Sequence, residues 1–70
     1  MKLSARNIVK GKVKKVNHGL VSSEVIVGLP NDLEIVSVIS KAAVENLNLK
    51  EGKEVYAIIN ANDVILATDY

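Results

Sequence analysis

A chain of 70 residues with no cysteine and one histidine excludes a disulfide framework, a cysteine-based zinc site and a histidine-rich metal centre. Its formal net charge is +1, from nine basic and eight acidic residues, so it has no general attraction to nucleic acid or membranes. No apolar run approaches the roughly 20 residues of a membrane-spanning helix. The first residues lack the pattern of a signal peptide, and we therefore expect a cytoplasmic protein.

The hydrophobic content is high for so short a chain. One domain, residues 1–70, is expected, and the core of so small a domain supplies only about 3–5 kcal/mol. Hydrophobic residues make up 49% of the chain, yet Phe and Trp are absent. Aliphatic faces in this abundance exceed what one small domain can bury, so we expect an obligate oligomer in which subunits cover them.

The first predicted element is a strand from Ile8 to Val16, where apolar and polar residues alternate. Its alternation breaks at Lys14–Val16, which indicates a bulge or the end of the strand. Gly11 within the run marks a bend, and Asn17–Gly19 supplies turn residues. The solvated face of this strand carries Lys10, Lys12 and Lys14.

Two further strands follow, over Leu20–Leu29 and Leu33–Ile39, separated by a turn at Pro30–Asp32. Ser40 is then placed to cap a short helix over Lys41–Leu47. A final hairpin pairs Glu54–Ile59 with Val64–Ala67 around residues 60–63. The order β-β-β-α-β-β predicts an all-β fold with small α content, a five-stranded barrel of the OB type.

Ser4 and Arg6 stand two residues apart at the start of the first strand, so both side chains point to the same face. A hydroxyl beside a guanidinium suits an oxygen-rich anion. On spacing alone a simpler interpretation is favoured, in which Ser4 caps the terminus and Arg6 makes a surface ion pair. The pattern by itself leaves both interpretations open.

Other functions find less support in the sequence. There is no cysteine nucleophile, and His18 lies in a turn, where histidines are usually solvated, so we expect no enzyme. Binders of single-stranded nucleic acid stack bases on aromatic side chains. Only Tyr56 and Tyr70 are present for that purpose, so we interpret the lysines of the first strand as a solvated face.

Five segments, in order and at matching spacing, resemble the molbindins, the small molybdenum-pterin-binding (Mop) domains now understood to bind molybdate. One departure within them is Ser23, where the family usually has Ala. The resemblance covers nearly the whole chain and is carried by Ser4–Asn7 with the following Lys10–Val13, Gly19–Val25, Ile35–Ser40, Leu47–Gly52 and Asp63–Ala67.

This resemblance implies an oxyanion-binding protein that stores molybdenum inside the cell. Molybdate, or a similar oxyanion such as tungstate, would bind at subunit interfaces of a homohexamer built as a trimer of dimers. No metal would be coordinated directly by side chains. Ser4, Arg6 and Ser40 match the residues that bind the anion in the family. A second group of expected participants comprises Ala5, Gly19, Val21, Ser22, Lys41, Asn60 and Asn62.

The last hairpin departs from the family pattern, because Asn60 stands where the family has an anion-binding lysine. Family members also often carry Ser in the first turn of the helix, where this chain has Ala43. A buried charge-assisted hydrogen bond is worth about 1.5–3 kcal/mol, so losing one charge and one or two hydroxyls would weaken binding by about 10²-fold or more. Asparagine amides can still donate, and Lys41 is a candidate substitute for the missing charge. The alternative is a structural oligomerisation module that has lost high-affinity anion binding.

Overall fold

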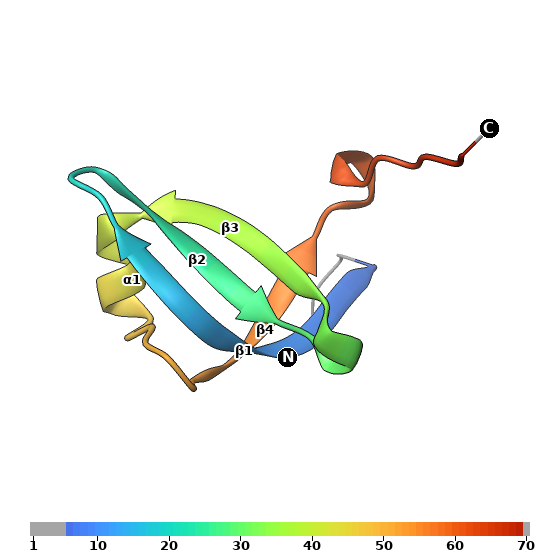
Figure 1. Ribbon diagram of the computed structural model, residues 1–70. Helices are drawn as coiled ribbons and strands as arrows, with labels where there is room; N and C mark the ends of the chain where they lie inside the picture. The colour runs from blue at the N-terminus through green and yellow to red at the C-terminus, as the bar shows by residue number, and fades with distance from the viewer. Residues whose placement is uncertain (1–5, 70) are drawn as a thin grey trace.

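The computed structural model describes residues 6–69, which fold into one curled antiparallel sheet and one short helix (Figure 1). The strands are β1 (Asn7–His18), β2 (Ser22–Gly28), β3 (Glu34–Ser40) and β4 (Glu54–Ile59), in the spatial order β3-β2-β1-β4. The helix α1 (Lys41–Asn46) follows β3, and two short 3-10 turns, η1 (Pro30–Asp32) and η2 (Ala61–Asp63), follow β2 and β4. The predicted all-β, OB-like class is confirmed.

Strand β1 is shared between two neighbours, and this sharing curls the sheet. Its first half, up to Lys12, pairs with β4, and its second half pairs with β2. The pairing register with β2 shifts between Val13 and Lys15, and β1 continues to His18, so of the two predicted alternatives the bulge is the one observed. Gly11 lies where β1 passes β2 closely: a methyl group there would be 2.5 Å from the carbonyl oxygen of Gly28. Only glycine fits this approach without moving backbone.

The core is small and aliphatic. Val13, Val25, Val27 and Val44 are buried, so the core joins β1 and β2 to the helix. The one buried polar side chain among the described residues is Ser23, on the same face of β2 as the two valines. Ser40 caps α1 as predicted, because its Oγ accepts a hydrogen bond of 3.0 Å from the backbone N–H of Ala43.

The predicted fifth strand over Val64–Ala67 is wrong for this structure, which has four strands in its described part. After β4 the chain makes the turn η2, and residues 64–69 then run away from the sheet without regular structure (Figure 1). A strand needs an edge to pair with, and this segment does not turn back to reach the free edge of β4. The result is a half-barrel in which β3 and β4 each keep one unpaired edge.

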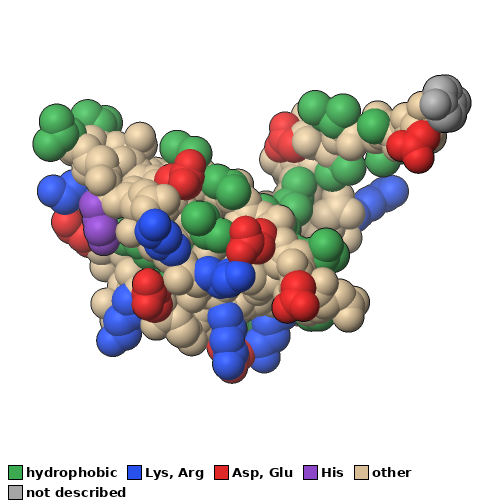
Figure 2. Space-filling view, viewed as in Figure 1, with side chains coloured by type: hydrophobic (Ala, Val, Ile, Leu, Met, Phe, Trp, Pro, Cys, Tyr) green, Lys and Arg blue, Asp and Glu red, His purple; other side chains and the backbone are tan. Residues whose placement is uncertain are grey.

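Large apolar side chains remain exposed on the outer face of the sheet, although their periodicity is that of well-formed strands. On β3, Val36 and Val38 are 56% and 67% exposed, and on β4 Tyr56 is 56% exposed. Figure 2 shows further hydrophobic side chains at the tip of the β1–β2 turn and along the C-terminal segment. A single copy therefore leaves much apolar surface uncovered, as the composition predicts.

Candidate functional site

One group of predicted site residues lies together at the end of the sheet formed by the β1–β2 turn and the start of α1. Ser22 pairs with Ser40 across β2 and β3. The backbone N–H of Lys41 donates to the carbonyl oxygen of Val21 at 3.0 Å, which fixes the turn against the helix. We call the exposed residues Gly19, Val21, Ser22, Ser40 and Lys41 the turn-end cluster.

The hydrogen bonds within the turn-end cluster decide which donors remain for a ligand. The backbone N–H groups of Lys41 and Ala43 are already engaged, by Val21 and by Ser40 Oγ respectively. The carbonyl oxygen of Val21 is engaged as well, because it accepts the hydrogen bond from Lys41. The Ser40 and Ser22 hydroxyls each have a hydrogen to donate, and the Lys41 ammonium is exposed. These side-chain groups are donors available to a ligand.

The second group of site residues lies where β1 begins and β4 ends. Asn7 pairs with Ile59 in the sheet, and its side-chain Nδ2 also donates to the Ile59 carbonyl at 3.3 Å. Arg6 and Asn60, the next residues outward on the two antiparallel strands, are therefore neighbours. Asn62 follows in η2. We call Arg6, Asn60 and Asn62, all exposed, the strand-end cluster.

Asn7 was missed as a contributor to this arrangement. Its amide holds the two strand ends together beside Arg6, so its role is one of positioning. The only signal for it in the sequence is its place directly after Ser4–Arg6 in the opening motif. Ser4 and Ala5 themselves lie outside the described residues.

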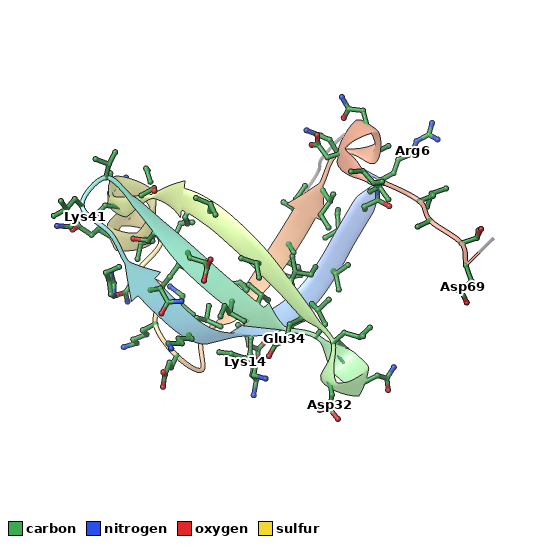
Figure 3. The ribbon with its side chains drawn as sticks, turned by 45° about the horizontal axis from the view of Figure 1, so that its top comes forward. Arg6, Lys14, Asp32, Glu34, Lys41 and Asp69 are labelled. Atoms are coloured by element: carbon green, nitrogen blue, oxygen red, sulfur yellow. The ribbon has the colours of Figure 1, made fainter. Side chains whose placement is uncertain are left out.

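The two clusters lie at opposite ends of the sheet, so one chain does not bring the predicted site residues together. Figure 3 shows Lys41 at the helix end and Arg6 at the far end, beside the start of the C-terminal segment. Arg6 and Ser40 can therefore face one ligand only if they come from different copies. For the same reason Lys41 cannot replace the missing charge beside Asn60 of its own chain.

The lysines of β1 are partly neutralised. Lys10 Nζ lies 2.9 Å from a carboxylate oxygen of Glu54, and Lys14 Nζ lies 2.6 Å from one of Glu34. Hydrogen bonding to Glu54 raises the pKa of Lys10, and the same contact lowers the pKa of Glu54. The pKa of Lys14 is raised in the same way by Glu34. All these groups are exposed, and they form strand-to-strand ion pairs outside both clusters.

Residues 6–69 contain neither a cluster of metal-binding side chains nor a membrane-spanning helix. No three histidine or acidic side chains gather there as ligands for a metal ion. The only α-helix in this range has six residues, which is too short to cross a bilayer.

Comparisons with known proteins agree on one family. The model of the TOBE domain matches residues 3–66. The protein described as molybdenum-pterin-binding protein 3 of Clostridium pasteurianum is 42% identical over 66 residues, covering 94% of this chain and 97% of that protein. Among solved structures, apo MopII of Clostridium pasteurianum has a TM-score of 0.90 at 39% identity, covering 96% of this chain and all of the other.

A second solved structure, the cytoplasmic molybdate-binding protein ModG with molybdate bound, has a TM-score of 0.84 at 44% identity. That match covers 87% of this chain and 43% of ModG, so the chain spans less than half of that protein. The matches agree in fold and in kind of protein. The chain therefore belongs to the TOBE domain family and, within it, to the molbindins, the molybdenum-pterin-binding (Mop) proteins that its opening motif resembles.

Proposed function

We propose that this chain, acting as a single domain over residues 1–70, binds molybdate at interfaces between copies of itself and stores molybdenum in the cytoplasm. Tungstate, with the same shape and charge, fits the same donors. No reaction is catalysed. Relatives described as molybdenum-pterin-binding and molybdate-binding proteins support this function. The observation that carries it is the separation of hydrogen-bond donors into two clusters at opposite ends of the sheet.

The chemistry of the two clusters suits a tetrahedral dianion. Such an ion presents only acceptors, so its site needs donors directed inward. The strand-end cluster offers the Arg6 guanidinium and the amides of Asn60 and Asn62, and the turn-end cluster offers two hydroxyls and the Lys41 ammonium. Joined across an interface, the clusters supply two positive charges against the two negative charges of molybdate. Ser4 is the further hydroxyl that we place beside Arg6.

Self-association supplies the interface that one copy lacks. The exposed apolar side chains of β3 and β4 are surfaces that a second copy can cover. We propose a homohexamer arranged as a trimer of dimers, in which the strand-end cluster of one copy meets the turn-end cluster of another. In that arrangement Lys41 of one copy provides the charge that Asn60 of the other lacks. The only partners required are the oxyanion and further copies of this chain. Nucleic acid and membranes are not expected to bind.

Isothermal titration calorimetry with molybdate, using sulfate as competitor, tests the binding proposal. Arg6→Gln removes a charge from the strand-end cluster and is expected to weaken molybdate binding by about tenfold or more. Lys15→Gln is the matched control, since it removes an exposed charge of the same sign from β1 outside both clusters. Equal affinities for Arg6→Gln and the wild type would exclude Arg6 from the site.

Lys41 needs its own measurement, because its part in binding depends on the meeting of two copies. Lys41→Ala is expected to lower molybdate affinity to a degree similar to Arg6→Gln. If the affinity does not change, Lys41 does not compensate for Asn60.

The second candidate function is a structural oligomerisation module without an anion. The neutral strand-end residue Asn60 favours it, because Arg6 is then the only cation in that cluster. A flat titration at millimolar molybdate, together with a solution mass near six chains, would establish this module. Micromolar affinity with the same mass establishes the binder.

A further inference from the structure

A carboxylate lies beside the hydroxyls of the turn-end cluster. Burial alternates along β2, so Ser22 and Glu24 are both exposed on the outer face, while Ser23 between them is buried on the inner face. Across the strand pair, Ser40 lies opposite Ser22, and Val38 lies opposite Glu24; both are exposed on the same outer face. The carboxylate is therefore one row of side chains away from the two hydroxyls, about 7 Å along the strands.

The Glu24 carboxylate keeps both its charge and part of its hydrogen-bonding capacity. Its Oε1 accepts a hydrogen bond of 2.9 Å from Nδ2 of Asn17, the residue opposite it on β1. An ionised carboxylate has about four acceptor positions, so Oε2 can accept from a further donor. No cation of residues 6–69 forms an ion pair with Glu24, whereas Glu34, the other carboxylate on this face of β2 and β3, is paired with Lys14.

An acceptor beside a group of donors distinguishes between tetrahedral oxyanions. Molybdate and sulfate carry no proton at neutral pH, so all their oxygens are acceptors and gain nothing from a carboxylate. The hydrogen phosphate dianion has the shape and charge of sulfate, but one of its oxygens carries a hydrogen that it can donate. A site that accepts a hydrogen bond from its ligand discriminates against an analogue without that donor.

We propose that Glu24 is a specificity-determining residue of the turn-end cluster, and that this cluster binds hydrogen phosphate in preference to sulfate. The Ser22 and Ser40 hydroxyls and the Lys41 ammonium donate to the unprotonated oxygens of the ion. The phosphate hydroxyl donates to Oε2 of Glu24, while Asn17 acts as a positioning residue that holds Oε1. The same negative charge lowers the affinity for molybdate. The inference rests on the proposed function, because it assigns a selectivity to one half of the proposed oxyanion site.

A purely structural role for Glu24 leads to a different expectation. The hydrogen bond between Asn17 and Glu24 joins β1 to β2, and a cross-strand pair of this kind contributes to the stability of the hairpin. Loss of that contribution would change Tm. It would not distinguish sulfate from hydrogen phosphate, which have the same shape and the same charge. The ratio of the two affinities therefore separates a role in selectivity from a role in stability.

Isothermal titration calorimetry with phosphate, sulfate and molybdate in turn tests the inference, at a mildly alkaline pH where phosphate carries two charges and one proton. The wild type is expected to bind phosphate about tenfold more tightly than sulfate. Glu24→Gln keeps the size of the side chain and removes its charge, so the phosphate-to-sulfate ratio should fall by about tenfold and molybdate affinity should rise. Glu51→Gln is the matched control, since it removes an exposed carboxylate outside both clusters and should leave the ratio unchanged.

The outcomes separate this inference from the proposed function. An equal phosphate-to-sulfate ratio in the wild type and in Glu24→Gln would overturn the inference, and so would a wild type that binds neither ion. If molybdate still binds in either case, the proposed function stands. A phosphate preference that Glu24→Gln abolishes, together with a flat molybdate titration, would refute molybdate binding and leave the role of Glu24 standing. Circular dichroism checks the folding of each variant, and Glu24→Ala replaces Glu24→Gln if the latter does not fold.

Discussion

Replacing Ser23 by alanine is expected to stabilise the protein. Ser23 is 2% exposed on the inner face of β2, and its Oγ has no hydrogen-bond partner in the described part of the chain. A hydroxyl buried without a partner costs about 1–3 kcal/mol, because it gives up its bonds to water. Alanine keeps the Cβ and removes only the oxygen. The molbindin resemblance also leads one to expect alanine at this position.

The size of the gain follows from two opposing contributions. Removing one oxygen leaves a cavity of about 15 Å³, which costs about 0.4 kcal/mol at about 24 cal/mol per Å³. The free energy of unfolding should therefore rise by about 1 kcal/mol. In a domain of this size that corresponds to an increase in Tm of about 4–8 °C.

Thermal and urea unfolding of Ser23→Ala, followed by circular dichroism, measures this gain. The wild type is compared at the same protein concentration, because association affects apparent stability. Ser22→Ala is the matched control: it makes the same change at the exposed neighbouring residue and should alter stability by less than about 0.5 kcal/mol. A loss of stability of about 1 kcal/mol in Ser23→Ala would refute the reasoning, since the hydroxyl would then have a partner in the assembled protein.

Substitutions at three further positions test the fold. Gly11→Ala should cost about 1–3 kcal/mol in urea unfolding, because its methyl group would lie 2.5 Å from the Gly28 carbonyl oxygen; an unchanged midpoint would contradict the close approach. Ser40→Ala should cost about 1 kcal/mol by removing the helix cap, and Ser40→Asp, which can still accept the hydrogen bond from Ala43, should restore most of it. Glu54→Gln should lower Tm slightly at neutral pH. Because Lys10 lowers the pKa of Glu54 below its ordinary 4.5, the pair stabilises the fold above that pH and its contribution disappears as the pH falls through the lowered value. The Tm values of the wild type and of Glu54→Gln should therefore converge in acid. A difference in Tm that persists there would exclude this ion pair as its cause.

The parts of the fold that could be predicted from the sequence depend on neighbours along the chain. Ser40 caps the helix because its hydroxyl reaches an N–H three residues away. The bulge after Val13 follows from a break in the alternation of apolar residues. Each of these features is encoded within a few positions, so periodicity and capping rules were sufficient to place them.

The features that could not be predicted depend on contacts between distant segments. The apolar run Val64–Ala67 has the composition of a strand, but composition does not say which edge it pairs with or in which copy. The separation of Arg6 from Ser40 follows from the way β1 divides its pairing between β4 and β2. The sequence placed Arg6 beside the start of the first strand and Ser40 at the start of the helix, but it could not give the distance between them.

The hydrogen-bond donors lie at two opposite ends of each chain, and this affects how mixtures of two variants behave. Each site in the proposed assembly takes one half from each of two subunits, so a defect at one end of a chain leaves the other end competent. Two defective chains, one altered only at Arg6 and the other only at the helix end, would therefore complement each other when co-assembled. With random mixing of equal amounts, about one site in four would draw both halves from intact ends.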